Sequence, residues 1–384
     1  MIKIIHIITT LTVGGAEMML YKLLSRMDRK SFSAEVIVLA ERGPVGEMIQ
    51  KLGITVRALG MRRAMPNPLG LAQLARWLKQ ARPHAIQTWM YHANLLGGLA
   101  AKLAGKIPVA WGIHHSNLDP QANKRATIWV AKACAHFSRT LANRIIYCSE
   151  SAQRAHAEIG YAPKHAQVIF NGIDLDDFKP DPTARASLRR ELGLAENALL
   201  IGLAGRFDPQ KDHHNFMQAA AQLQQQNPAV HFVLCGEGIT WENQKLVAWI
   251  EAGALRGHCH LLGRRGDMPR LMAALDIAAS SSYGEGFPNV IGEAMACGVP
   301  CAVTDAGDSA LMVGDTGKVA PRRNPLALAN AWRELIDRGP EKRQQLGQAA
   351  RQRVQDNFAL DKIVRQYEAV YKNLAAEGKR DARI

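Results

Sequence analysis

The sequence predicts an α/β protein built from two doubly wound domains that face each other across a cleft. The chain has 384 residues, which is more than one hydrophobic core usually serves. Short apolar runs alternate with amphipathic helical patterns, as in parallel sheets that carry helices on both faces. This alternation pauses at a Pro- and Asp-rich stretch, 174–184, and then starts again. The sequence therefore predicts two parallel sheets joined by a linker.

The first domain is expected over residues 1–175. Its apolar runs predict strands at 2–8, 33–40, 54–60, 85–90, 108–115 and 144–149. The spacing of apolar residues predicts helices at 16–27 and 69–83. Ligands bind where the strands of an open parallel sheet end, so we expect the chemistry in the loops that follow these strands.

The second domain is expected over residues 176–360 and repeats the pattern. Its apolar runs predict strands at 198–206, 231–238, 259–263, 277–282 and 299–305. Helical patterns cover 213–227, 243–255 and 290–298. A last segment, 361–384, contains a helical pattern at 361–377, and we expect it to pack back on the first domain.

Basic residues are concentrated in the front half of the chain. The net charge is +14; residues 1–190 hold 26 Lys and Arg against 12 Asp and Glu, whereas residues 191–384 hold 22 of each kind. Such a surplus of positive charge favours an anionic partner. The partner could be nucleic acid, an anionic membrane surface or a charged acceptor. The cations that we single out for a basic face are Arg62, Arg63, Lys102, Lys106, Lys124 and Arg125.

Two further features limit the class of protein. No apolar run reaches the roughly 20 residues that cross a bilayer, and the first run is too short for a signal peptide, so we expect a cytoplasmic protein. The six cysteines form no CxxC pair and predict no metal site.

Two loops carry candidates for binding an anion. In "TVGGAE", Gly14 and Gly15 follow a strand and open a helix, where a backbone can approach a phosphate closely. The alternative is that a strand-to-helix turn simply needs glycine. In "GRFDPQKDH", Arg206 and Lys211 flank a turn after a strand and suit a diphosphate, although two solvated surface charges would look the same.

A third loop, "SSYGEGFPNVIGEAMACGVP" at 281–300, places Glu285 before a helix start and Glu293 about one turn into the helix. The amides around Gly286–Val290 can hold a phosphate or sugar oxygen. Each glutamate can accept sugar hydroxyls, although either one alone is more simply a solvent-exposed residue. Together they suggest that Glu285 faces a sugar and Glu293 a ribose.

This segment is similar to the E-x7-E segment of retaining family 4 glycosyltransferases, which have the GT-B fold of two Rossmann-like domains around a nucleotide-sugar cleft. Four more segments resemble the family in the same order: "VGGAE", "VIFNGIDLDDF", "GRFDPQKDH" and "LCGEG". The resemblance implies that Arg206 and Lys211 bind the donor diphosphate without a metal and that no cofactor is needed. The other residues that it assigns to the donor are Gly15, Arg264, Arg265, Glu285, Gly286, Phe287, Pro288, Asn289, Val290 and Glu293.

The resemblance also implies an active-site histidine and an acceptor side. His114 and His115 end a strand in "WGIHHS"; His114 fits the strand register better, but the choice between them stays open, as does a structural role. The catalytic residues would be His114, Glu285, Arg206 and Lys211. The acceptor side would hold Trp89, Tyr91, His92, Asn94 and His115, although core packing explains Trp89 nearly as well. Asp174 and Asp176 resemble a metal-binding D-x-D, but they lie in the interdomain loop and we expect no metal there.

The interpretation that follows is a retaining hexosyltransferase. We expect a UDP-sugar donor, with guanosine as the second choice of base, and an acceptor that is a glycan or is linked to polyprenyl diphosphate. With such an acceptor, we expect the enzyme to act in bacterial surface polysaccharide assembly. We also expect it to contact the inner face of an anionic membrane as a peripheral protein. The alternatives are a nucleotide-sugar epimerase of the same architecture and a basic nucleic-acid-binding protein; no RNA-binding module is visible, so we expect no nucleic acid.

Overall fold

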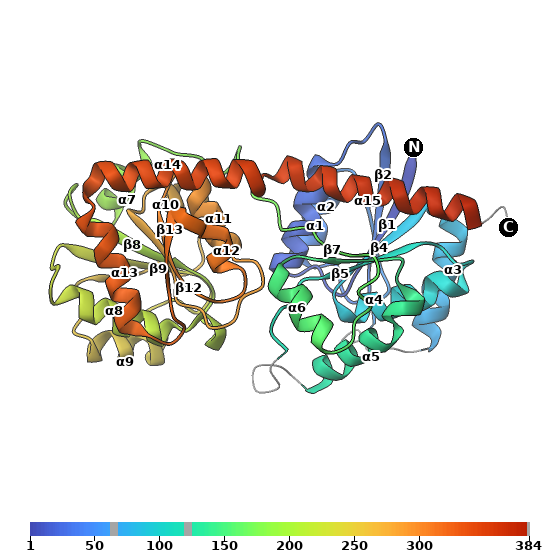
Figure 1. The fold of residues 1–384 in the computed structure, drawn as a ribbon, viewed down its shortest axis with the longest axis horizontal. Coiled ribbons are helices and arrows are strands. Elements are labelled where there is room, and N and C mark those ends of the chain that lie inside the picture. The colour runs from blue at the N-terminus through green and yellow to red at the C-terminus, as the bar shows by residue number, and fades with distance from the viewer. Residues whose placement is uncertain (62–67, 119–124, 382–384) are drawn as a thin grey trace. The chain divides into compact units, whose positions relative to one another are not determined.

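The computed structural model describes residues 1–61, 68–118 and 125–381 and divides the chain into two compact units (Figure 1). The first unit holds Met1–Gly172 and Leu360–Ile384, and the second holds Ile173–Ala359. Of the cations singled out above, Arg62, Arg63 and Lys124 lie outside the described residues.

The first unit is a parallel sheet in the strand order β3-β2-β1-β4-β5-β6-β7. Its strands are buried apolar runs such as "IKIIHII", which need helices on both faces of the sheet. The strands are β1 (Ile2–Ile8), β2 (Phe32–Val38), β3 (Thr55–Ala58), β4 (Ala85–Trp89), β5 (Val109–Ile113), β6 (Arg144–Tyr147) and β7 (Ala166–Val168). The helices are α1 (Gly15–Arg26), α2 (Gly43–Lys51), α3 (Pro68–Ala81), α4 (Tyr91–Leu103), α5 (Arg125–Leu141), α6 (Glu150–Glu158) and α15 (Leu360–Asp381).

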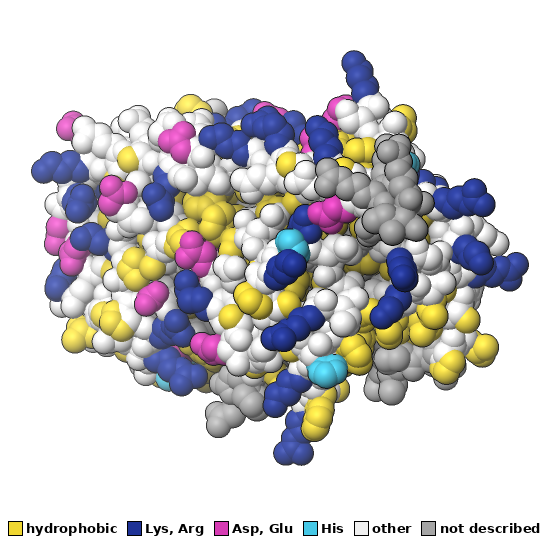
Figure 2. Space-filling model, turned by 45° about the vertical axis from the view of Figure 1, so that its right-hand side comes forward, with side chains coloured by type: hydrophobic (Ala, Val, Ile, Leu, Met, Phe, Trp, Pro, Cys, Tyr) yellow, Lys and Arg dark blue, Asp and Glu magenta, His cyan; other side chains and the backbone are white. Residues whose placement is uncertain are grey.

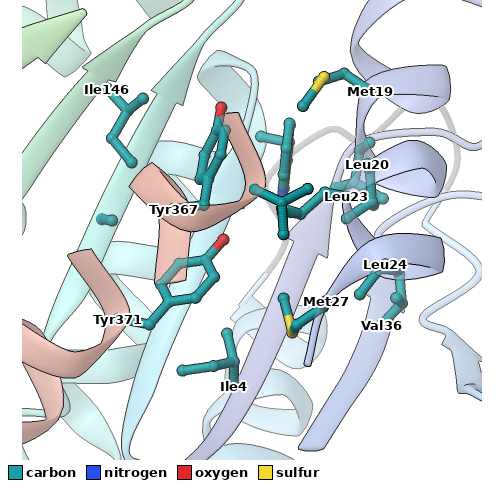
Figure 3. Close-up of a cluster of buried hydrophobic side chains, with 14 of the residues drawn as sticks. Ile4, Met19, Leu20, Leu23, Leu24, Met27, Val36, Ile146, Tyr367 and Tyr371 are labelled. Carbon is teal, nitrogen blue, oxygen red and sulfur yellow. The ribbon is translucent and has the colours of Figure 1, made fainter. Parts of the chain in front are cut away.

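Each face of this sheet has its own core. One cluster of buried side chains comes from α3, α4 and α5, and the other comes from α1, α2 and α15. Figure 3 shows Tyr367 and Tyr371 of α15 in the same cluster as Leu23 of α1 and Ile4 of β1. Helix α15 contacts α1, β1 and β4, so the last helix of the chain is part of the first unit.

The second unit is also a parallel sheet, in the order β10-β9-β8-β11-β12-β13. Its strands are β8 (Leu199–Ala204), β9 (Val230–Cys235), β10 (Cys259–Leu261), β11 (Ile277–Ser280), β12 (Cys301–Thr304) and β13 (Gly317–Ala320). Its helices are α7 (Ala184–Glu191), η2 (Pro209–Lys211), α8 (His213–Gln224), α9 (Gln244–Ala252), α10 (Met268–Ala273), α11 (Asn289–Ala296), α12 (Ser309–Val313), η3 (Gly314–Thr316), α13 (Pro325–Asp337) and α14 (Gly339–Asn357).

These two strand orders confirm the predicted fold class of two doubly wound α/β domains. In each sheet the strand order reverses once, between β1 and β4 in the first sheet and between β8 and β11 in the second. Open parallel sheets bind ligands beyond the carboxyl ends of the strands at this switch point. In the second unit the loops there are 205–212 and 281–288, and in the first unit the loop 9–14 follows β1. Over the described ranges, none of the helices combines the length and the apolar composition needed to cross a bilayer.

Candidate active site

The loop after β8 carries both predicted cations. Its one-turn helix η2 is capped by Asp208, whose Oδ1 accepts the Gln210 N–H at 2.9 Å. The other oxygen of Asp208 accepts a hydrogen bond from Arg206 Nε at 3.1 Å. The Arg206 side chain is nevertheless 66% exposed. Asp208, which the sequence analysis did not single out, therefore orients Arg206 and leaves its other guanidinium nitrogens accessible.

Lys211 pairs with Glu285 across the switch point of the second sheet. The Lys211 Nζ lies 2.5 Å from Glu285 Oε1, and the Ser282 hydroxyl donates to the same oxygen at 2.7 Å. Ser281 Oγ also donates to the Lys211 carbonyl at 2.8 Å, which ties the loop after β11 to the loop after β8. Only 11% of the Glu285 side chain is exposed, so the pair fixes an ammonium and a carboxylate at one place.

Two glycines let neighbouring loops close on this pair. Gly236, after β9, has φ +144°, and a Cβ there would lie 2.1 Å from the Gly205 carbonyl oxygen. Gly307, after β12, has φ +57°, and a Cβ there would lie 2.2 Å from the Glu285 carbonyl oxygen. Any side chain at either position would push the loops apart. Gly236 belongs to the "LCGEG" segment, so the structure gives that motif a physical reason.

Helix α11 begins directly after the Glu285 loop. Its N-cap is Pro288, which makes no side-chain capping bond, and Phe287 packs against Phe358 with ring centroids 5.5 Å apart. Glu293 lies on the second turn and is half-buried. A helix N-terminus carries partial positive charge, so this end of α11 favours an anion beside Glu285. The predicted residues around this helix start are Gly286, Phe287, Pro288, Asn289 and Val290.

The structure separates the roles of the two predicted arginines after β10. Arg265 binds Asp267 through Nε at 2.8 Å and Glu191 through a second nitrogen at 2.8 Å, and both pairs raise the pKa of the guanidinium. Arg264 is exposed. The backbone of this loop is held to the turn after β9, since Gly263 O accepts the Gly236 N–H at 2.8 Å. The Arg265 side chain is thus engaged in ion pairs within the second unit.

The loop after β1 in the first unit is organised by a glutamate. Gly15 begins α1 and Gly14 is its N-cap. Glu17 is 7% exposed and accepts a hydrogen bond from Thr10 Oγ1 at 3.1 Å. A Cβ on Gly14 would lie 2.5 Å from a Glu17 oxygen, so a side chain there would require the Glu17 carboxylate to move. Burial raises the pKa of Glu17. Glu17 belongs to the "VGGAE" segment, but nothing in the sequence alone indicated its role.

His114 follows β5 and stacks on Trp89, with ring centroids 4.9 Å apart and planes 19° from parallel. Both of its ring nitrogens are buried, and desolvation lowers its pKa to about 4. The imidazole is therefore neutral near pH 7, with one N–H and one lone pair. His115 is half-buried and meets the Tyr91 ring edge-on at 6.4 Å.

Three of the residues predicted for the acceptor side lie in the core of the first unit. Trp89 is fully buried and donates from Nε1 to His6 at 3.3 Å. The Tyr91 hydroxyl bonds to His156 at 2.7 Å. Asn94, also fully buried, accepts from Thr88 at 2.7 Å and donates to the Gly112 carbonyl at 3.2 Å. Asn94 ties α4 to the sheet, whereas Trp89 packs in the cluster of α1, α2 and α15, where it stacks on Tyr367. The apolar strand "AIQTW" was the signal for burial.

The remaining predicted residue on that side is His92, on the first turn of α4. It is half-buried, and desolvation lowers its pKa. Asp174 Oδ1 accepts the Asp176 N–H at 3.0 Å, so the D-x-D sequence closes a local turn.

Comparison with known proteins identifies the family. The model of "Glycosyl transferases group 1" matches residues 184–353, and the model of "Glycosyltransferase Family 4" matches residues 13–177. Together the two matches span most of both units.

The chain is similar to proteins of known activity. The UDP-Gal:alpha-D-GlcNAc-diphosphoundecaprenol alpha-1,3-galactosyltransferase of Escherichia coli is 27% identical over 313 residues, which are 79% of each protein. The N,N'-diacetylbacillosaminyl-diphospho-undecaprenol alpha-1,3-N-acetylgalactosaminyltransferase of Campylobacter jejuni is 25% identical over 363 residues, 90% of this chain and 93% of the relative. Anabaena Alr3699/HepE, solved in complex with UDP and glucose, superimposes with a TM-score of 0.84 at 25% identity over 97% of this chain and 100% of that one. The chain therefore belongs to the family 4 glycosyltransferases, and its two units are the Rossmann-like domains of a GT-B fold.

Proposed function

We propose that this protein is a retaining, metal-independent hexosyltransferase that moves a sugar from a UDP-sugar to an acceptor linked to polyprenyl diphosphate. The observation that carries the proposal is the Lys211–Glu285 pair at the switch point of the second sheet, beside the exposed Arg206. HepE, solved with UDP and glucose, supports the donor. The Escherichia coli and Campylobacter jejuni relatives, named for acceptors on diphosphoundecaprenol, support the acceptor. With such an acceptor we propose a place in bacterial surface polysaccharide assembly.

The proposed chemistry is electrostatic. As the bond from the sugar C1 to the diphosphate oxygen breaks, charge develops on the leaving group. We assign the stabilisation of that charge, without a metal, to Arg206, Lys211 and the N-terminus of α11. The acceptor hydroxyl attacks C1 on the same face, and a donor phosphate oxygen takes its proton. Glu285 is poorly suited to form a covalent intermediate because its Oε1 is already bound by Lys211 and Ser282.

The other roles follow the family resemblance. We propose that Glu293 binds the ribose and that the backbone at Arg264 and Arg265 binds the base. The backbone at Gly15 would lie close to the donor phosphate. The neutral His114 can hydrogen-bond the transferred sugar. His92 and His115, which are half-buried, take the acceptor contacts that the core residues Trp89, Tyr91 and Asn94 are too buried to make. The match to glycosyltransferase models favours this function over an epimerase or a nucleic-acid-binding protein.

A panel of nucleotide-sugars with a polyprenyl-diphosphate-linked acceptor tests the proposal. We expect turnover with a UDP-sugar, a product with the anomeric configuration of the donor, and equal rates with and without EDTA. NMR of the product gives the configuration. An inverted product would contradict retention, and activity that depends strictly on Mg²⁺ would contradict metal-independent catalysis.

The division of labour between the two glutamates is testable by substitution. Glu293→Gln is expected to weaken UDP binding about tenfold, because a neutral amide accepts a ribose hydroxyl less strongly than a carboxylate. Glu285→Gln is expected to lower kcat and leave the affinity for UDP nearly unchanged, since its role is at the sugar. Calorimetric titration with UDP, which lacks the sugar, separates the two. Equal loss of UDP affinity in both variants would contradict the assignment.

A further inference from the structure

The outer faces of α3, α4 and α5 form a surface with basic and apolar side chains and no acidic ones. None of these three helices contains an Asp or a Glu. Over residues 48–149 the sequence has 14 Lys and Arg against a single acid, Asp119. We call this surface the α3–α5 face. Its exposed cations are Arg76, Lys79, Lys102, Arg125, Lys132 and Arg139.

Large apolar side chains stand exposed on the same helices. Trp129 is 73% exposed, Leu69 84%, Leu103 65% and Phe137 39%. These exposed apolar groups lie on helices whose exposed charged side chains are all cations, a combination that indicates an interaction surface. In the right-hand part of Figure 2, dark blue Lys and Arg side chains are more frequent than magenta Asp and Glu.

Helix α5 shows the pattern most clearly. Its inward stripe packs into the core of the first unit and consists of Ala131, Cys134, Ala135, Ser138 and Leu141. Its outward stripe runs Arg125, Trp129, Lys132, His136, at intervals of three and four residues that place them on one side of the helix. Phe137 adjoins this stripe. The helix thus buries one face in the protein and turns an aromatic, basic face to solvent.

We propose that the α3–α5 face, centred on the outward stripe of α5, docks this enzyme on an anionic bilayer. Indole rings favour the level of the lipid headgroups, and long cationic side chains can reach anionic headgroups while their stems lie among apolar groups. The aliphatic Leu69 and Leu103 favour acyl chains over nucleic acid, whose bases stack on aromatic rings. The inference rests on the proposed function in one respect: an acceptor linked to polyprenyl diphosphate gives the enzyme a reason to sit on a membrane.

Vesicle co-sedimentation with the full chain tests this surface. We expect binding to vesicles of phosphatidylcholine with phosphatidylglycerol at low salt, and little binding to pure phosphatidylcholine or at high salt. Each cation near an anionic surface strengthens binding about fivefold, so Arg125→Gln with Lys132→Gln is expected to weaken it roughly 25-fold. Trp129→Ser is expected to weaken binding and to abolish the blue shift of tryptophan fluorescence on vesicles.

Matched controls come from the second unit. Arg338 and Lys342 are exposed cations there, and Trp241 is an exposed tryptophan, so Arg338→Gln with Lys342→Gln, and Trp241→Ser, are expected to bind vesicles like the wild type. Equal binding by the α5 variants and the wild type would overturn the proposal. So would tight, salt-dependent binding to RNA without any binding to anionic vesicles.

Failure of this inference is distinct from failure of the proposed function. A protein that transfers sugar to a polyprenyl-diphosphate-linked acceptor presented in detergent, but ignores anionic vesicles, overturns only the docking surface. A protein that binds vesicles through α5 but turns over no nucleotide-sugar overturns only the proposed function.

Discussion

Replacing Lys211 or Arg206 with Ala is expected to lower kcat about 100-fold or more, which corresponds to roughly 3 kcal/mol of transition-state stabilisation. Both cations lie on the loop after β8, beside the point where the strand order of the second sheet reverses. Lys211→Ala has a second consequence, because it removes the ammonium that neutralises the largely buried Glu285. That carboxylate would then repel the leaving diphosphate, so we expect Lys211→Ala to be the more damaging of the two.

Three measurements make this result interpretable. Steady-state kinetics give kcat, calorimetry with UDP gives the affinity for the leaving nucleotide, and thermal unfolding shows whether the loop still folds. Lys342→Ala, which removes an exposed cation from α14, is the matched control and is expected to behave like the wild type. If both active-site variants kept near-normal kcat with an unchanged melting temperature, the diphosphate would have to bind elsewhere.

The sequence predicted the central strands of both sheets and missed strands at their edges. Strands such as β1 and β8 are buried on both faces, so they appear as continuous apolar runs. Strands β7 and β13 lie at the edges, are short, and have mostly half-buried or exposed residues. Nothing in "AQV" or "GKVA" distinguishes them from a loop. They are strands because they pair in parallel with a neighbouring strand, and that pairing depends on residues far away in the sequence.

The candidate site shows the same limit. The sequence located Arg206, Lys211 and Glu285, because each follows a predicted strand and lies in a motif. It did not pair Lys211 with Glu285, which are 74 residues apart and meet only because β8 and β11 are neighbours. Similarly, Trp89 and Asn94 flank the end of a strand, and only the stacking of His114 and the bond from Thr88 show that they face inward. A residue's position just after a strand predicts that it lies in a loop at the ligand-binding edge of the sheet. Only the packing of the folded chain decides whether its side chain is accessible to a ligand.

Acidification below about pH 6.5 is expected to destabilise the fold, because several histidines are buried in the neutral form. Desolvation lowers the pKa of His6 to about 3, and the pKa values of His114, His156 and His213 to about 4. In the unfolded chain these groups titrate near the ordinary value of 6.5. Between about pH 6.5 and 4 the unfolded state therefore binds more protons, and the free energy of unfolding falls as pH falls.

The slope of the free energy of unfolding against pH is measurable. Each such histidine contributes about 1.4 kcal/mol per pH unit within that window. Glu17 opposes the trend, since burial raises its pKa and the folded state then holds its proton more tightly, but it is one group against these four histidines and His260, whose pKa desolvation also lowers to about 4. Denaturant unfolding at a series of pH values from neutral to acidic gives the dependence directly.

His6→Gln is the sharpest variant for this test. The Trp89 indole donates to His6 Nδ1 at 3.3 Å, and the glutamine carbonyl can take over as acceptor without titrating. Because Nδ1 accepts this bond, the neutral ring carries its proton on Nε2, and a second proton would have to go on Nδ1, where it would face the Trp89 N–H. We expect His6→Gln to reduce the acid slope by one histidine's share and the exposed control His136→Gln to leave it unchanged. Identical slopes for wild type and His6→Gln would mean that His6 is solvated and protonates as freely in the folded protein as in the unfolded chain.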